Sequence, residues 1–418
     1  MAVYKLFPTQ DATINSEKTE SNAGLDAILE VSQYKDDTKS ADTTIVERDP
    51  WDNQDVVWDS SSFAWNSTPT SSTDVALQLN RYLIQYSTTE INDLVDNYIG
   101  SSQWDATLKN YIAYAQGIDE ETILEVWPIA YDWDNGSGKT GDTPINKDGV
   151  SWKHRVKLGT SERPWPTGSS FTTLVTGSSP NDAPGGGAWY TGSSNPSLTL
   201  PKTQSFDTRT FKDLNIGVTD IVDTWYKTSK NINPYTSINN NGFIIKLNEK
   251  TELNASKDIQ PIFKYYSVDT NTIYPPILEI KWDDYNRNTL LDEVSSQDIY
   301  VNLDNNQGEF HYSAVNRFRL NVRPEFPIRT YQTSSLYTTN HVLPENSYYA
   351  IKDLDTNEYV VDFDTTYTKI SADNTSNYFD VYMNGLEPER YYKILIKTHI
   401  NEEIIVKDNK YYFKVING

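Results

Sequence analysis

The sequence predicts an all-β protein with two domains. Aromatic residues make up 13% of the 418 residues, and short apolar runs alternate with turns rich in Asn, Asp, Ser and Gly. Aromatic and β-branched residues pack well on half-buried strands, and the turn residues end such strands after a few positions. The mean hydropathy of −0.63 fits strands that are buried on one side only. Helix bundles need runs of Ala, Leu, Glu and Lys, so the composition disfavours them.

The first two-thirds of the chain is predicted to contain strands and two short helices. Alternating residues, or apolar runs between turns, predict strands over 3–14, 27–31, 81–86, 109–116, 121–131, 242–247 and 276–282. Apolar residues recur every three or four positions over 89–99 and 218–225, which predicts helices there. A polar bridge follows Trp282, so we expect the first domain to span residues 1–284.

Two polar stretches interrupt this series. Residues 33–75 and 134–205 are rich in Ser, Thr, Asn and Asp, and the second contains Pro184-Gly185-Gly186-Gly187. Such composition favours turns and hairpins over long strands. We interpret both stretches as insertions into the first domain, and ordered insertions of this length are commonly binding loops.

Residues 285–418 form the second predicted domain. Strands are expected near 299–303, 310–322, 348–354, 359–363, 378–383, 391–398, 404–406 and 411–416. Turn residues such as Asp355-Thr356-Asn357 separate them at intervals typical of a β-sandwich. The fold expected for the whole chain is therefore a β-sandwich with long loop insertions, followed by a second β-sandwich.

Seven short motifs follow one another between residues 11 and 282. They are Asp11-Ala12-Thr13-Ile14, Gly24 with Leu29-Glu30-Val31, Arg81-Tyr82-Leu83-Ile84, Asp132-Trp133-Asp134 with Trp152, Val218-Thr219-Asp220-Ile221-Val222, Gly242-Phe243-Ile244-Ile245, and the proline-initiated strand 276–282. In this order they resemble DNRLRE-type domains, some of which are classed as carbohydrate-binding modules. The resemblance implies a jelly-roll β-sandwich over residues 1–284, and the two insertions depart from its pattern.

A second resemblance lies near the C-terminus. Leu386-Glu387-Pro388-Glu389-Arg390-Tyr391-Tyr392 precedes a predicted strand. It resembles the corner of fibronectin-III-like and immunoglobulin-like domains, where a Tyr begins a late strand and its hydroxyl bonds back to a loop. Residues 348–397 are also similar to terminal domains of virion structural proteins in tailed phages. These resemblances imply an Ig-like docking domain in a phage particle.

The chain is strongly acidic. It has 58 Asp and Glu against 36 Lys and Arg, a net charge of −22, and no Cys. That charge repels nucleic acid and anionic membranes, so we expect neither as a partner, and the lack of Cys excludes disulfides. The first residues do not resemble a signal peptide, and no apolar run reaches membrane-spanning length. We expect a protein made in the host cytoplasm and localised in the virion.

No catalytic or cofactor-binding motif is found in the sequence, so neither catalytic residues nor a cofactor are predicted. The four His lack metal-ligand spacing. Two oxygen-rich stretches, 132–136 and 284–288, have residue types found in calcium loops. The first lacks the closing Glu, because Thr143 stands in its place, and the second is equally typical of a polar linker. No metal site is therefore predicted.

The tryptophans are the candidate binding residues. Several lie in or beside predicted strands and helices and are expected in the core, namely Trp127, Trp133, Trp152, Trp225 and Trp282. Loop tryptophans anchor protein interfaces or stack on sugars when exposed, but they also cover a core from outside. We predict partner or ligand binding by the loop residues Trp165, Trp189, Trp51, Trp58 and Trp65.

Three hypotheses of function follow. The first is a non-enzymatic structural protein of a tailed phage, in the neck, tail, baseplate or fibre attachment. It would contact other virion proteins and form a homo-oligomer around a symmetry axis. The second is a carbohydrate-binding module of an adhesin or polysaccharide-targeting system, with a surface polysaccharide as partner. The third is a hydrolase that uses two of the abundant carboxylates.

Overall fold

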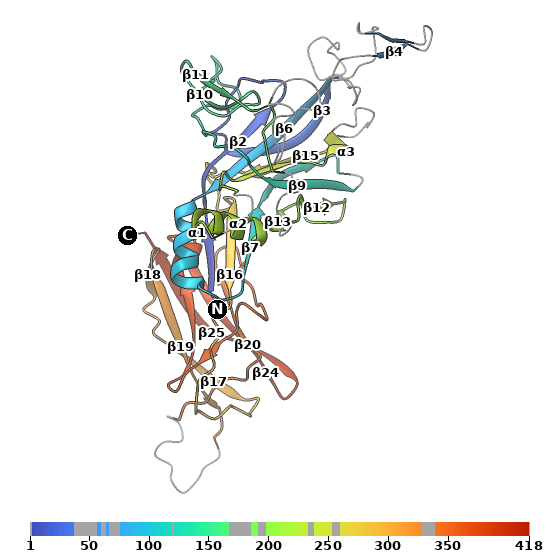
Figure 1. The fold of residues 1–418 in the computed structure, drawn as a ribbon. Helices are drawn as coiled ribbons and strands as arrows, with labels where there is room; N and C mark the ends of the chain where they lie inside the picture. The colour runs from blue at the N-terminus through green and yellow to red at the C-terminus, as the bar shows by residue number, and fades with distance from the viewer. Residues whose placement is uncertain are drawn as a thin grey trace. The chain divides into compact units, whose positions relative to one another are not determined.

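Strands dominate the structure. The computed structural model describes residues 2–36, 57–59, 64–66, 76–118, 121–166, 185–190, 198–232, 238–252, 260–327 and 339–417. Strands make up 46% of the structure and helices 9%, so the prediction of an all-β protein is confirmed. Figure 1 shows the strands gathered into sheets along the chain.

Internal contacts divide the chain into two compact units. The N-terminal unit comprises Phe7–Asp93 and Ala106–Leu278. The C-terminal unit comprises Met1–Leu6, Leu94–Asp105 and Glu279–Gly418. The contacts thus join two early segments to the C-terminal unit, and the predicted domains 1–284 and 285–418 stay a prediction.

The N-terminal unit is built on one large antiparallel sheet. Its strands follow the order β12-β9-β14-β6-β3-β15-β8, and β2 also pairs with β6. Their bounds are β2 (Pro8–Asn15), β3 (Ile28–Asp36), β6 (Ala76–Tyr86), β8 (Ile112–Gln116), β9 (Thr122–Pro128), β12 (Lys202–Phe206), β14 (Phe243–Leu247) and β15 (Ile262–Tyr266). Ile244 of β14 lies opposite both Trp127 and Leu83, so these side chains share one face of the sheet.

Different segments cover the two faces of this sheet. On one face, the ring of Phe243 lies 4.7 Å from that of Trp225 on α2 (Thr219–Ser229). The other face, which includes Leu83 and Ile244, is covered by residues of the second insert, namely Val150, Trp152, Trp165, Ala188 and Trp189. The insert therefore contributes one layer of the core.

Along the sequence, shorter elements lie between the strands of the large sheet. Three antiparallel pairs are β7 (Trp104–Asn110) with β13 (Leu214–Gly217), β10 (His154–Leu158) with β11 (Ser161–Pro164), and β4 (Val57–Asp59) with β5 (Ala64–Asn66). The remaining helical elements are α1 (Thr88–Leu94), the π-helical turn Val95–Ile99 and α3 (Glu249–Glu252). The helices predicted over 89–99 and 218–225 are confirmed. Within the described ranges, no helix is long and apolar enough to cross a membrane.

The C-terminal unit contains two packed sheets. The first has the order β17 (Ile299–Asp304), β19 (Val315–Pro324), β23 (Asn377–Tyr382) and β22 (Ser371–Ala372). The second has the order β18 (Glu309–His311), β25 (Glu403–Ile416), β24 (Tyr391–Ile400), β20 (Ser347–Asp353) and β21 (Tyr359–Val361). In a further sheet β1 (Ala2–Leu6) lies beside β16 (Ile277–Trp282), and a 3-10 turn, Met383–Gly385, follows β23.

Aromatic rings from these two sheets meet in the core of the C-terminal unit. The ring centroid of Phe379 on β23 lies 4.2 Å from that of Tyr349 on β20 and 5.6 Å from that of Phe318 on β19. Phe413 of β25 lies 5.7 Å from Phe318. These rings come from both sheets and are buried, so the unit is a β-sandwich.

A tyrosine ties β24 to the loop before it. Tyr392 is buried, and its hydroxyl donates a hydrogen bond of 2.8 Å to the backbone carbonyl of Glu387. A bond of this kind is what the resemblance to Ig-like domains implies for a tyrosine at the start of a late strand. The family assignment itself stays a proposal.

Candidate functional site

Trp165 and Trp189 are buried, which contradicts our expectation of exposed rings. Their exposed fractions are 1% and 7%. Trp165 donates from Nε1 to the carbonyl of Ser151 at 3.0 Å, and the backbone of Trp189 bridges to that of Ile129. The expectation failed because the insert folds back onto the large sheet and its rings cover the core. Their role in binding stays a prediction.

The other tryptophans divide into two groups. The core positions expected for four of them are confirmed, since the buried side chains include Trp133, Trp152, Trp225 and Trp282. In the first insert, Trp58 lies opposite Trp65 in the pairing of β4 with β5. Trp51 lies outside the described residues, and binding by these three loop tryptophans stays a prediction.

The tryptophans of the second insert surround a buried charge in the N-terminal unit. Arg81 of β6 donates from Nε to Oε1 of Glu252 at 3.0 Å and from Nη2 to Oε2 at 2.8 Å. The rings of Trp152 and Trp189 lie 5.0 and 5.4 Å from its Cζ. The guanidinium is thus held by a bidentate carboxylate and by aromatic faces, which together compensate for its lost hydration.

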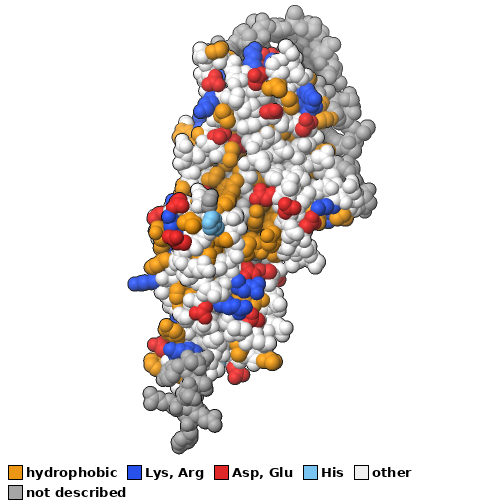
Figure 2. Space-filling view, turned by 90° about the vertical axis from the view of Figure 1, so that its left-hand side faces the viewer, with side chains coloured by type: hydrophobic (Ala, Val, Ile, Leu, Met, Phe, Trp, Pro, Cys, Tyr) orange, Lys and Arg blue, Asp and Glu red, His pale blue; other side chains and the backbone are white. Residues whose placement is uncertain are grey.

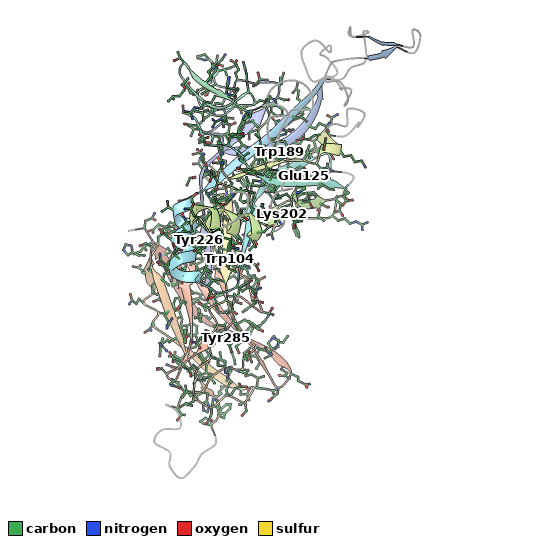
Figure 3. The ribbon with its side chains drawn as sticks, viewed as in Figure 1. Trp104, Glu125, Trp189, Lys202, Tyr226 and Tyr285 are labelled. Carbon is green, nitrogen blue, oxygen red and sulfur yellow. The ribbon has the colours of Figure 1, made fainter. Side chains whose placement is uncertain are left out.

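Lys246 of β14 extends this cluster of charges. Its Nζ lies 3.1 Å from Oε2 of Glu252 and 3.4 Å from Oε2 of Glu125. The same ammonium lies 5.7 Å from the ring centroid of Trp189, which is labelled with Glu125 in Figure 3. Burial raises the pKa of Glu252, but Arg81 and Lys246 outweigh that effect and hold its pKa below the usual value. Glu252 is therefore ionised at neutral pH.

Two glycines allow the insert to approach the cluster. Arg81 donates from Nη1 to the carbonyl of Gly186 at 2.6 Å. A Cβ on Gly185 would lie 1.9 Å from the carbonyl oxygen of Trp152, and one on Gly186 would lie 2.8 Å from Nη1 of Arg81. Both glycines also have positive φ, at 136° and 80°. The glycine run therefore serves close packing, and the cluster fastens the insert to the sheet.

The calcium-like stretches gain no support as metal sites. Among the residues that the structure describes, no three His, Asp or Glu side chains gather closely enough to hold a metal ion. Asp132 pairs with Arg155, and Asp134 accepts from the backbone of Gly136 at 3.0 Å. In the second stretch, the backbone of Asn286 donates to Oγ of Ser371 at 3.1 Å.

Asp11 of β2 is also buried, but unlike Glu252 it accepts its hydrogen bond from a backbone N–H. Its Oδ2 accepts from the backbone N–H of Val268 at 2.7 Å, while Oδ1 is buried without a hydrogen-bond partner in the described part of the chain. Burial raises the pKa of Asp11 to about 7, against the lowering effect of the Val268 donor and with a further rise from Asp269. The residue is only 1% exposed, so its titration acts on stability.

A row of side chains with a partly exposed tyrosine at each end crosses four strands of the C-terminal unit. Directly opposed residues on antiparallel strands share a face of the sheet. Tyr359, Lys352, Lys393 and Tyr412 oppose one another in this order across β21, β20, β24 and β25. The rings of Tyr359 and Tyr412 are 46% and 42% exposed, so the row faces outward.

Two further pairs continue this outward face. Lys397 of β24 lies opposite Tyr348 of β20, whose side chain is buried, and Tyr391 of β24 lies opposite Lys414 of β25. Tyr391 is 52% exposed, whereas its neighbour Tyr392 is buried. We define the lysine–tyrosine face as the outward surface formed by Lys352, Tyr359, Tyr391, Lys393, Lys397, Tyr412 and Lys414.

Two lysines of this face have carboxylate partners. Nζ of Lys393 lies 2.8 Å from Oδ2 of Asp408, and Lys414 pairs with Glu389. Hydrogen bonds to these carboxylates raise the pKa of both lysines. Each lysine–carboxylate pair is locally neutral, and the carboxylate comes from a turn or strand next to the face.

The other two lysines are held by rings. Nζ of Lys352 lies 4.9 Å from the ring centroid of Tyr359, and Nζ of Lys397 lies 4.9 Å from that of Phe363. Neither lysine has a carboxylate partner among the described residues. The face therefore carries an excess of positive charge within a chain whose net charge is −22.

In the other sheet of the same sandwich, formed by β17, β19, β23 and β22, arginines on the outer face are paired with carboxylates. Arg317 pairs with Asp380 at 2.8 Å, and Arg319 pairs with Asp373 at 2.9 Å. Both guanidinium groups also lie over the ring of Tyr378. Figure 2 likewise shows acidic and basic side chains interspersed on the surface that it draws. These two paired arginines differ in this respect from Lys352 and Lys397.

Our sequence reasoning missed the lysine–tyrosine face. The strand over 391–398 was predicted, and its sequence Tyr391-Tyr392-Lys393-Ile394-Leu395-Ile396-Lys397 places Tyr391, Lys393 and Lys397 on one side. That alternation was the available signal. It does not reveal which strands lie beside β24, so the clustering of lysines from β20 and β25 needed the structure.

Comparison with known proteins finds no relative of this chain. No family model matches the chain, and neither a curated protein nor a solved structure is similar to it. The DNRLRE-type and Ig-like resemblances therefore stay proposals. Function has to be argued from the surfaces and clusters of the chain itself.

Proposed function

We propose that the chain is a non-enzymatic structural protein of a tailed-phage particle, in the neck, tail, baseplate or fibre attachment, and that it acts through protein–protein interfaces. The lysine–tyrosine face carries this proposal. Tyrosine is enriched in protein interfaces, where its ring supplies apolar area and its hydroxyl a polar group. Three half-exposed tyrosines on one sheet face fit that use.

The phage setting rests on the C-terminal resemblance. Residues 348–397 resemble terminal domains of virion structural proteins, and they contain most of the strands that form the lysine–tyrosine face. The bond from Tyr392 to Glu387 supports an Ig-like docking domain. A docking domain with an open sheet face is suited to an assembly of many subunits.

Internal pairing of buried charges supports a binding role over a catalytic one. Arg81, Lys246 and Glu252 satisfy one another beneath the insert. A glycosidase needs two carboxylates in a groove that substrate can enter. Glu252 is 3% exposed, so it does not meet that requirement.

The carbohydrate-binding alternative has less support. It rests on the DNRLRE-type resemblance, and its best candidate stacking rings, Trp165 and Trp189, are buried. A sugar ring needs an exposed aromatic face for stacking. We therefore do not carry this function further.

Particle composition tests the proposal. Purified virions of the phage that encodes this chain should contain it in stoichiometric amounts, as measured by mass spectrometry. Antibodies against the C-terminal unit should mark one region of the particle in electron micrographs. A chain that is expressed during infection but absent from purified particles would contradict the proposal.

A further inference from the structure

The lysine–tyrosine face contains two like charges in direct opposition. Lys352 of β20 lies opposite Lys393 of β24. Like charges at directly opposed positions destabilise a strand pair. Asp408 offsets the charge of Lys393, whereas Lys352 lies beside the ring of Tyr359 and has no carboxylate partner in the described part of the chain. The fold alone does not explain this arrangement, whereas an external carboxylate beside Lys352 would offset it.

The layout of the face fits a broad acidic surface. Its lysines come from three neighbouring strands, which lie about 4.8 Å apart in a sheet. Exposed rings of Tyr359, Tyr391 and Tyr412 lie among these lysines. A protein surface can supply spread carboxylates and apolar contacts together, which a small anion cannot.

The chain itself is acidic overall. Its 58 Asp and Glu exceed its 36 Lys and Arg, so its net charge of −22 is opposite in sign to that of the lysine–tyrosine face. Two copies cannot join these faces to each other about a two-fold axis, because lysines would then meet lysines. A contact between copies must therefore be heterologous, with the face of one copy on a different surface of the next.

We propose that the lysine–tyrosine face of one copy docks on an acidic surface of a second copy of this chain. This inference rests on the proposed structural function and names the partner of its interface. Heterologous contacts of this kind close into a ring or extend into a filament, according to the rotation between copies. Lys352 and Lys397, which lack carboxylates within the described chain, supply the unpaired cations of the contact.

Sedimentation of the purified full-length chain tests the proposal. We expect larger species to form as the concentration rises from micromolar to several hundred micromolar at low salt. The contact depends on charge, so it should weaken when the ionic strength is raised to about 0.5 M, where screening is strong. A wild-type chain that stays monomeric at high concentration and low salt would overturn the proposal.

Paired charge reversals locate the contact. Lys352→Glu with Lys397→Glu should weaken self-association about tenfold or more, because two attractive charges become repulsive. The matched control is Lys18→Glu with Lys139→Glu, which changes two exposed lysines of the N-terminal unit and alters the net charge equally. The control should associate as the wild type does. Equal effects of both double variants would overturn the placement on this face.

The tyrosines provide a second test that leaves the charge unchanged. Tyr412→Ala should weaken self-association and keep its salt dependence. Thermal unfolding of each variant checks that the fold is retained, and Lys352→Glu should not lower the melting temperature, because it removes the like-charge pair. Self-association that Tyr412→Ala leaves unchanged would contradict the role of the rings.

A different binding partner of the lysine–tyrosine face would give a different experimental result. If the wild type stays monomeric but binds heparin or duplex DNA, and the lysine reversals abolish that binding, the face serves a polyanion and the proposal fails. A chain that is present in virions but monomeric alone would overturn this inference and leave the proposed function standing. A chain that self-associates through this face but is absent from virions would do the reverse.

Discussion

The two sheets that carry the candidate sites differ in what covers their outer faces. In the N-terminal unit, the insert lays Trp152, Trp165 and Trp189 over the large sheet, where Arg81 is bound by Glu252. In the C-terminal unit, the tyrosines of the lysine–tyrosine face are 42% to 52% exposed. The chain thus buries these three tryptophans and leaves Tyr359, Tyr391 and Tyr412 partly exposed. The contrast teaches that tryptophan, which has the larger apolar area, was a poorer guide to an exposed surface than tyrosine.

Burial also explains how the charges differ between the two faces. A buried cation needs a hydrogen-bonded counter-charge, because losing hydration costs more than the fold can otherwise offset. An exposed cation has water and needs no partner. Arg81 and Lys246 therefore share Glu252, whereas Lys352 stands beside a ring. Mutations on the covered face should change folding, and those on the open face should change association.

Breaking the buried charge cluster should have the largest effect. Glu252→Gln keeps the shape but leaves Arg81 and Lys246 buried without their shared carboxylate. Removing one partner of a buried ion pair lowers the free energy of unfolding by about 3–5 kcal/mol. Denaturant titration monitored by tryptophan fluorescence measures this loss.

Glu402→Gln is the matched control for this variant. Glu402 is exposed at the turn between β24 and β25 and should tolerate the same chemical change within about 0.5 kcal/mol. Equal stabilities of Glu252→Gln and Glu402→Gln would show that the cluster does not fasten the insert.

Asp11 should make the covered sheet sensitive to pH. Burial raises its pKa in the folded state to about 7, from the ordinary value of 3.8 for an aspartate. The folded chain therefore binds the proton more tightly, so this stabilisation is complete below about pH 4 and is lost as the pH rises through 7. Between about pH 5 and 8 the loss should reach roughly 2–3 kcal/mol in the free energy of unfolding.

Asp11→Asn should remove this part of the pH dependence, because the amide oxygen still accepts from Val268 but does not ionise. Denaturant titrations at both pH values would measure the difference between variant and wild type. Parallel pH profiles of the two proteins would mean that Asp11 does not titrate near 7.

The fold was more predictable from the sequence than the site was. Regular patterns such as Phe243 to Leu247 and Val218 to Trp225 identified a strand and a helix, because local periodicity determines which side is buried. β15 was missed, since Ile262–Tyr266 is short and follows a polar stretch. Strand order and register arise from contacts that are distant in sequence, so Lys352 opposite Lys393 was not foreseeable.

The error at Trp165 has a related cause. Gly, Pro and Ser around a tryptophan indicate a loop, and we took a loop position to mean exposure. The glycines instead allow the loop backbone to lie against Trp152 and Arg81. Composition predicts irregular backbone well, but it does not predict whether that backbone lies on a sheet or extends into solvent.

Removing one tyrosine hydroxyl from each side of the sheet that contains β24 and β25 compares its inner and outer faces. Tyr392→Phe removes the hydroxyl that donates to Glu387 from inside the sandwich, and should cost about 1 kcal/mol in the free energy of unfolding. Tyr412→Phe removes a hydroxyl from the open face and should change stability by less than about 0.5 kcal/mol. Denaturant titration of both variants measures the difference, and a larger loss for Tyr412→Phe would invert the assignment of the faces.

The smallest effect is expected to have the opposite sign. Lys352→Glu replaces a like-charge opposition to Lys393 with an attractive one, so it should raise the free energy of unfolding of the monomer by about 0.2–1 kcal/mol. Denaturant titration at low protein concentration, where copies do not associate, measures the change. Lys139→Glu has no opposed lysine on a neighbouring strand and serves as the control. An assembly surface can contain a residue that is electrostatically unfavourable in the monomer and needed for association. Destabilisation by Lys352→Glu would remove this energetic argument for the surface.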